Sequence, residues 1–246
     1  MCLRLVGSEM CIRDRGDLGD NDLLTIFNTE NKNDLLERSL EILLQIQNSK
    51  HIQVENFSGK ELEGQMNLFK DIFCKKFLKI KIDQTVDKLI SETIEALLKH
   101  PWVNCHFDFE RRNLVLNKNN DLTVIDYQDM KQGPIGIDLA GILIDHYYEV
   151  DISNVKELLN HYSNLMKSKY SESDLFEFLR WGCIQRNLRI LGTLSNLYLT
   201  KKRSFRLKDL PMILNNLIAM IPGDHESTEF MKNKVKPALV ARISEL

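Results

Sequence analysis

The sequence predicts an α+β fold in which helices predominate. Apolar residues recur at spacings of three and four along most of the chain before residue 100 and after residue 138, as in amphipathic helices. Between these regions, residues 102–105, 114–116 and 122–125 form short strand-like runs, the last two joined by a turn. We therefore expect a few short strands within a largely helical chain.

The helical pattern divides into segments on both sides of the strands. The helix before the first strand is expected to end at His100, because a residue that precedes proline is disfavoured in helices. The last helix is expected to break at Pro237. The predicted helices are residues 21–27, 34–47, 61–82, 83–99, 139–148, 152–169, 173–199, 207–221 and 228–244.

Composition narrows the class of protein. The chain has 246 residues, of which 43% are hydrophobic, which is enough to bury a core. No apolar run reaches the length of a membrane span and no secretory signal is recognisable, so we expect a soluble, cytoplasmic protein without a membrane partner.

The net charge is -2 with Lys and Arg scattered, which argues against a nucleic-acid partner. The five cysteines are odd in number and lack C-x-x-C spacing, so buried thiols are expected rather than disulfides or a zinc site.

Residues 1–15 differ from the rest of the chain. They contain two cysteines and three arginines without helical or strand periodicity, and the run MCIRD resembles the in-frame translation of a sequencing-library adapter. We expect this segment to be non-native and residues 16–246 to form the domain. The alternative is a genuine but irregular terminus.

The candidate catalytic residues lie within residues 104–138. His106-x-Asp108-x-x-x-x-Asn113 occupies a loop before the strand at 114–116. In phosphoryl transfer, an aspartate placed in this way accepts the proton of the attacking hydroxyl, and the asparagine holds magnesium. Asp126 directly follows the returning strand, so two hard oxygen ligands are expected to converge. The alternative is a surface turn with capping aspartates.

These motifs resemble the kinase-like aminoglycoside phosphotransferase superfamily, and more closely the bacterial anomeric kinases of N-acetylmuramate and N-acetylglucosamine. The resemblance covers residues 16–221. It rests on DLGD at 17–20, the loop at 106–113, VIDYQD at 124–129, GP-x-x-x-DL at 133–139, and W-x-x-x-QR-x-x-R-x-x-G at 181–192.

The resemblance implies the C-terminal lobe of a protein-kinase-like fold with a short catalytic hairpin, and ATP and Mg²⁺ as cofactors. It implies Asp108 as the general base and Asn113 and Asp126 as magnesium ligands. The backbone at Asp17, Leu18 and Gly19 is expected near the adenine.

Further residues have supporting or less specific roles. Asp138 could be the N-cap of the predicted helix at 139–148, and the resemblance implies that it also hydrogen-bonds the catalytic-loop backbone. His106 is expected to be structural, because Asp108 already supplies the base. Asp129 is a candidate substrate-binding residue, with a supporting or turn-starting role as alternatives.

Gln185, Arg186 and Arg189 interrupt the apolar stripe of the helix at 173–199. Such donors suit a hydroxyl-rich or carboxylate-bearing sugar. The alternative is a solvated helix face that packs against another helix.

The sequence also departs from the family. The glycine-rich phosphate loop and its lysine are not visible, so we expect a chain that lacks the N-terminal lobe and is inactive as written. Glu110 stands where these kinases often have a different polar residue, which leaves the acceptor open.

A small acceptor is indicated by the spacing of two aspartates. Asp126 and Asp138 are twelve residues apart (138 minus 126), which leaves no room for a peptide-docking activation segment, and Phe107 replaces the arginine of regulated protein kinases. We expect an ATP-dependent kinase of a cell-wall amino sugar, at the anomeric hydroxyl, in peptidoglycan recycling. The alternatives are an aminoglycoside or other small-alcohol phosphotransferase and, from another class, a non-catalytic helical binding module or pseudokinase.

Overall fold

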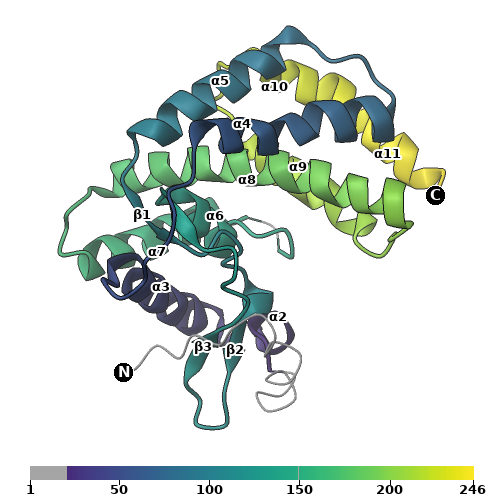
Figure 1. The fold of residues 1–246 in the computed structure, drawn as a ribbon. Coiled ribbons are helices and arrows are strands. Elements are labelled where there is room, and N and C mark those ends of the chain that lie inside the picture. Colours follow the sequence, from purple (N-terminus) through teal and green to yellow (C-terminus); the bar gives the residue numbers. More distant parts are fainter. Residues whose placement is uncertain (1–20, 149) are drawn as a thin grey trace. The chain divides into compact units, whose positions relative to one another are not determined.

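The computed structural model describes residues 21–148 and 150–246 (Figure 1). It divides into two compact units. The first contains the residues up to Asn56, Pro101–Asp145 and Asp151–Leu179, and the second contains Phe57–His100, His146–Val150 and Arg180–Leu246. Most described residues are helical and the strands are short, so the prediction of a mainly helical α+β chain is confirmed. The boundary predicted after residue 15 lies outside the described residues, and that division stays a prediction.

Two small antiparallel sheets lie in the first unit. Strand β2 (Leu114–Leu116) pairs with β3 (Leu122–Val124) as the predicted hairpin, which Figure 1 shows with its connecting turn. Strand β1 (Trp102–Cys105) pairs with β4 (Lys131–Pro134), so that Cys105 lies opposite Lys131. The sequence did not predict β4, because Gly133 and Pro134 are poor strand formers.

The first unit also contains helices, some of which contact these sheets. They are α2 (Leu23–Ile26), α3 (Lys32–Asn48), α6 (Gly136–Leu143), α7 (Ile152–Leu165) and the first residues of α8 (Glu172–Lys201). Helices α3 and α7 pack on each other (Figure 1). Helix α6 begins three residues before the predicted start and ends at Leu143 rather than residue 148. All eight of its residues are buried, so the helical periodicity expected of a half-exposed helix is missing.

The regular elements of the second unit are all helices among its described residues. Helix α4 (Gly59–Leu68) starts at a capping box between Ser58 and Glu61 and continues as a π-helix, η1 (Phe69–Leu78). The other elements are α5 (Gln84–Lys99), the 3₁₀ turn η3 (Leu207–Asp209), α9 (Leu210–Met220), α10 (Ser227–Phe230), the π-helix η4 (Met231–Val235) and α11 (Lys236–Ser244), in addition to the remainder of α8.

The predicted break at Pro237 is wrong. Helical structure continues from α10 into α11, and the π-helix η4 ends directly before Lys236. Proline lacks an N–H group and collides with the carbonyl four residues earlier in a regular helix. The altered hydrogen bonding of a π-helix is one way in which a helix absorbs such a residue.

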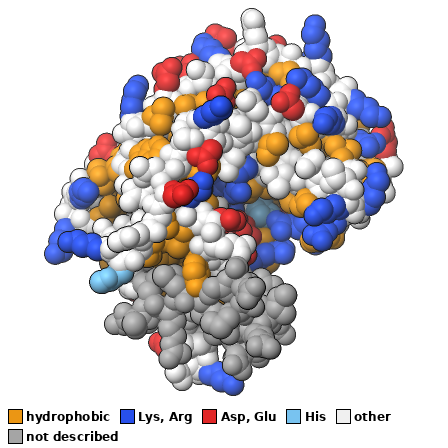
Figure 2. Space-filling model, viewed as in Figure 1, with side chains coloured by type: hydrophobic (Ala, Val, Ile, Leu, Met, Phe, Trp, Pro, Cys, Tyr) orange, Lys and Arg blue, Asp and Glu red, His pale blue; other side chains and the backbone are white. Residues whose placement is uncertain are grey.

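Cys74, Cys105 and Cys183 are free and buried, as the sequence predicts. Burial raises the pKa of the Cys74 and Cys183 thiols to about 12, so both remain protonated at neutral pH. Lys and Arg side chains are distributed over the face shown in Figure 2, with Asp and Glu among them. None of the described helices is long and apolar enough to cross a bilayer.

Two glycines permit close helix packing. A Cβ atom on Gly136, at the start of α6, would lie 1.8 Å from the carbonyl oxygen of Phe178 in α8. In the second unit, a Cβ atom on Gly192 would lie 2.4 Å from the Cβ of Leu68. Gly192 ends the family-like motif at 181–192, and this contact gives that glycine a packing reason.

We expect Gly136→Ala to lower the free energy of unfolding by about 1–3 kcal/mol or more, because the new methyl group overlaps a backbone oxygen that cannot move alone. Urea unfolding measures this loss. Gly64→Ala is the matched control, since Gly64 is an exposed residue of α4 where an added methyl group would meet no heavy atom within 4 Å. The control should gain up to about 1 kcal/mol from helix propensity. Equal unfolding midpoints for Gly136→Ala and the unmutated chain would contradict the packing argument.

Candidate active site

The carboxylate of Asp138 holds the start of the loop that carries Asp108. Its Oδ2 accepts a hydrogen bond from the backbone N–H of His106 at 2.6 Å, and its Oδ1 accepts one from Phe107 at 2.9 Å. Asp138 is 1% exposed and lies in the first turn of α6, whose N-cap is Ile135, so it is not the N-cap of this helix. Two charge-assisted bonds in a buried site fix the loop to α6.

The backbone is left-handed at Phe107 in the loop and at Asp126 after the hairpin, in addition to Asn120 in the hairpin turn. Phe107 has φ 63° and Asp126 also has φ 63°. This conformation costs about 1–3 kcal/mol per residue and persists only where neighbouring contacts enforce it. The Phe107 ring lies against Gly133 of β4, where an added Cβ would be 2.6 Å from the ring. Asp138 therefore holds the backbone of Phe107, and Gly133 leaves space for its ring.

His106 is a buried side chain that contacts the hairpin. It is fully buried, and its Nε2 lies 3.0 Å from the carbonyl oxygen of Ile125. Its ring meets Phe109 edge-on, with centroids 6.1 Å apart. A fully buried imidazole bonded to backbone is suited to a structural role, and it connects the loop to the residue before Asp126.

Asp108 and Asn113 are in direct contact. The amide nitrogen of Asn113 donates to the backbone carbonyl of Asp108 at 2.8 Å and to its carboxylate Oδ2 at 3.2 Å. Asp108 is half-buried, whereas Asn113 is buried. The bond orients the Asp108 carboxylate while leaving it accessible, and it leaves the Asn113 oxygen as the atom suited to bind a cation.

Asp126 is brought beside Asn113 by the hairpin. The backbone N–H of Ile125 donates to the carbonyl of Asn113 at 3.0 Å, so the next residue, Asp126, follows directly from this contact. Among residues 21–148 and 150–246, no group of three or more His, Cys, Asp or Glu side chains could hold a metal. One amide and one carboxylate nonetheless fit Mg²⁺, which takes few protein ligands and completes its shell with water and phosphate oxygens.

A buried ion pair anchors the second half of the loop, and the sequence analysis missed it. Arg111, in the 3₁₀ turn η2 (Arg111–Asn113), has its Nε 2.5 Å from Oδ2 of Asp145. Both side chains are nearly inaccessible, and the guanidinium lies 3.7 Å from the ring centroid of Phe27. The only sequence signal was a second arginine in the loop, which does not identify a partner 34 residues away (145 minus 111).

The other candidate residues are distributed differently. Asp129 is exposed in the turn before β4. Asp17, Leu18 and Gly19 lie outside the described residues. The segment that follows them is attached to the hairpin, because the N–H of Leu116 donates to the carbonyl of Asn21 at 3.0 Å.

Gln185, Arg186 and Arg189 belong to the second unit. Gln185 is fully buried and donates to Oε1 of Gln65 at 2.7 Å, and Arg186 is 1% exposed. These two residues are therefore not on a solvated face, although Gln185 does pack against another helix, α4, through Gln65, while Arg189 is half-buried. Their role in acceptor binding stays a prediction.

The helical fold with its Asp108 loop and short hairpin defines a chain of the kinase-like phosphotransferase class. A model of the phosphotransferase enzyme family matches residues 32–175, more than half of the chain. The chain belongs to this family.

Individual relatives are more distant. The chain is 26% identical over 215 residues to an N-acetylmuramate/N-acetylglucosamine kinase from Neisseria meningitidis, covering 82% of this chain and 64% of that protein. It is 25% identical over 225 residues to the kinase of the same name from Pseudomonas aeruginosa, covering 87% and 66%. The chain thus spans slightly less than two thirds of the length of these relatives.

Solved structures confirm the fold. The choline kinase LicA from Streptococcus pneumoniae is similar with a TM-score of 0.55 and 14% identity, over 76% of this chain and 64% of that one. A structure of LicA in complex with AMP gives a TM-score of 0.57 at 14% identity, over 78% and 65%. At this identity, the likeness concerns the fold.

We expect Asp145→Ala to lower the free energy of unfolding by about 3–5 kcal/mol, because it leaves the Arg111 charge buried beside Phe27 without its carboxylate. The double variant Arg111→Met with Asp145→Leu should lose less, since it removes both charges and refills the space. Urea unfolding of the two variants provides the comparison. If the double variant were the less stable one, Arg111 and Asp145 would not be acting as a buried pair.

Proposed function

We propose that this protein transfers the γ-phosphoryl group of magnesium ATP to a hydroxyl of an N-acetylated amino sugar such as N-acetylmuramate or N-acetylglucosamine. The observation that carries the proposal is the contact of the Asn113 amide with the Asp108 carboxylate, on a loop fixed by Asp138. The names of the relatives support the acceptor class. Transfer to the anomeric hydroxyl, within peptidoglycan recycling, is the specific form of the proposal.

In this reaction, Asp108 accepts the proton of the sugar hydroxyl as its oxygen attacks the γ-phosphorus. The bond from phosphorus to the β,γ-bridging oxygen breaks, ADP leaves, and the sugar keeps the phosphoryl group. Asn113 orients the carboxylate through its amide nitrogen. The partial exposure of Asp108 permits the acceptor to reach it.

Asn113 and Asp126 are the residues that would hold Mg²⁺. The ion, when bound, neutralises charge on the transferring phosphoryl group. A neutral amide and a single carboxylate leave coordination positions for phosphate oxygens, as expected for magnesium held together with a nucleotide.

The fold favours a small acceptor. The residues between Asp126 and Asp138 form a turn and then β4, which pairs with β1. Phe107 packs against Gly133 in the same strand. A segment used in this way cannot also extend to dock a peptide, which separates this arrangement from protein kinases.

The test is an acceptor panel followed by ³¹P NMR of the products. Because no glycine-rich phosphate loop is recognisable in this sequence, it is run with the 246-residue chain and with the longest natural polypeptide that contains residues 16–246. A sugar 1-phosphate formed from N-acetylmuramate or N-acetylglucosamine is expected. Choline or kanamycin as the preferred acceptor in an active polypeptide would refute the amino-sugar assignment.

In the active polypeptide, Asp108→Asn should lower kcat by about 10²–10⁴-fold, because the amide cannot accept the hydroxyl proton. Nucleotide affinity should change little. Asp121→Asn is the matched control, since Asp121 is an exposed aspartate beside the hairpin turn. Steady-state kinetics of the two variants distinguish the loss of a general base from the loss of one negative charge. Undiminished turnover by Asp108→Asn would remove Asp108 from the mechanism.

A further inference from the structure

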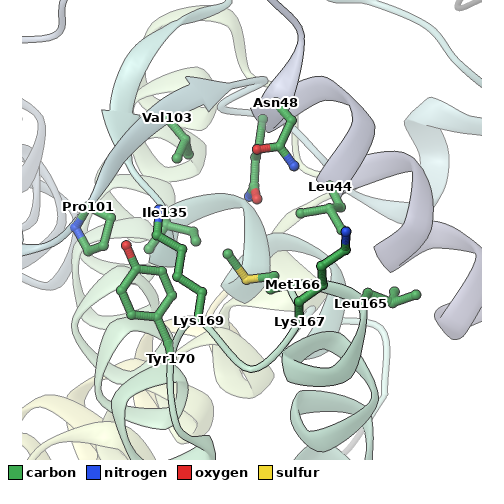
Figure 3. Close-up of a pocket in the computed structure, with 11 residues that line it drawn as sticks. Leu44, Asn48, Pro101, Val103, Ile135, Leu165, Met166, Lys167, Lys169 and Tyr170 are labelled. Carbon is green, nitrogen blue, oxygen red and sulfur yellow. The ribbon is translucent and has the colours of Figure 1, made fainter.

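The first unit contains a pocket of about 220 Å³ that no candidate catalytic residue lines (Figure 3). Its apolar walls come from α3, β1, the residue before α6 and the end of α7. One water needs only about 10–15 Å³, so the space admits a small organic molecule. The apolar residues are Leu44, Pro101, Val103, Ile135, Leu165 and Met166.

Gln47 supplies a buried donor at this pocket. Its side chain is 8% exposed and lines the cavity, and its Nε2 has no hydrogen-bond partner among the described residues. The hydroxyl of Tyr162 donates to Oε1 of Gln47, which fixes the orientation of the amide. Burial raises the pKa of Tyr162, so this hydroxyl stays protonated. An unpaired buried N–H costs about 1–3 kcal/mol, and an acceptor atom of a ligand would recover part of that cost.

Two lysines supply positive charge at the pocket. Lys167 and Lys169 lie in the turn after α7, and both side chains extend from it along the pocket with Met166 between them (Figure 3). Within the part of the chain that the structure describes, neither forms an ion pair with a carboxylate. The backbone at Lys167 is left-handed with φ 57°, and Ser168 follows with φ 54°. This turn places two cations beside a pocket that also has apolar walls.

We propose that this pocket binds a small organic carboxylate with an apolar body. The two ammonium groups and the Gln47 amide would engage the carboxylate, since hydrogen bonds to charged acceptors are the strongest that such donors form. The apolar walls would cover the rest of the ligand. A bare inorganic anion leaves those walls unused, and a neutral apolar molecule leaves the lysines unused.

The position of the pocket relates it to the catalytic loop. Val103 lies on β1 three residues before His106, and Ile135 lies three residues before Asp138. Each of these two pocket residues is therefore close in sequence to one partner of the hydrogen bond between His106 and Asp138. A ligand here contacts Val103 and Ile135 but not Asp108, so it is not the phosphoryl acceptor.

The test is a titration of the 246-residue chain with benzoate, followed by ¹H–¹⁵N NMR in the absence of nucleotide. We expect saturable shifts at Gln47, Val103 and Lys169. Benzamide and inorganic phosphate should each bind at least about tenfold more weakly, because benzamide lacks the carboxylate charge and phosphate lacks an apolar body. Since no nucleotide is needed, the outcome is independent of the phosphotransferase proposal.

The double variant Lys167→Ala with Lys169→Ala should weaken benzoate about tenfold, whereas Lys118→Ala, an exposed lysine of the hairpin turn, should not. Gln47→Glu keeps the acceptor for Tyr162 but replaces the donor with a repelling carboxylate, and it should also weaken binding. The exposed lysines keep the test valid if Gln47→Glu fails to fold. Absence of benzoate binding, equal binding of benzamide or phosphate, or equal affinity in the double variant would each overturn the proposal.

Discussion

The candidate site depends on one buried carboxylate. The Asp138 carboxylate accepts hydrogen bonds from the backbone N–H groups of His106 and Phe107. These two bonds hold a loop whose backbone is strained at Phe107. A left-handed phenylalanine is unfavourable by itself, so the energy of two charge-assisted bonds, each about 1.5–3 kcal/mol, is needed to maintain it. The shape of the loop then turns the next residue, Asp108, toward Asn113. Helix α6 therefore affects the position of Asp108 through a single side chain, Asp138.

Local sequence patterns predicted most elements of the fold. Strands β1 and β2 have the predicted bounds, because short strand-forming runs end at a proline or a turn on each side. Strand β4 was missed because its stability comes from pairing with β1, which no local pattern records. The start of α6 was misplaced for a related reason: Gly136 begins this helix by packing against the Phe178 carbonyl, and a glycine is a weak local signal for a helix start.

The sequence could indicate the candidate residues of the loop and hairpin, but not the tertiary contacts that hold them in place. The hairpin pattern indicated that Asp126 would return beside Asn113, because a hairpin brings the chain back to its starting point. The Arg111 to Asp145 pair depends on tertiary packing, and periodicity does not identify it. Gln185 and Arg186 show the opposite failure. Their polarity suggested an accessible surface, whereas both are buried, and the amide nitrogen of Gln185 donates to Gln65.

The central claim is that Asp138 acts on phosphoryl transfer only by holding the loop that presents Asp108. A double-mutant cycle of kcat with Asp108→Asn and Asp138→Asn, in the active polypeptide and at a temperature where every variant is folded, tests it most directly. Asp138→Asn should lower kcat strongly when Asp108 is present and have little further effect in the Asp108→Asn background. Two full losses that multiply in the double variant would contradict this account.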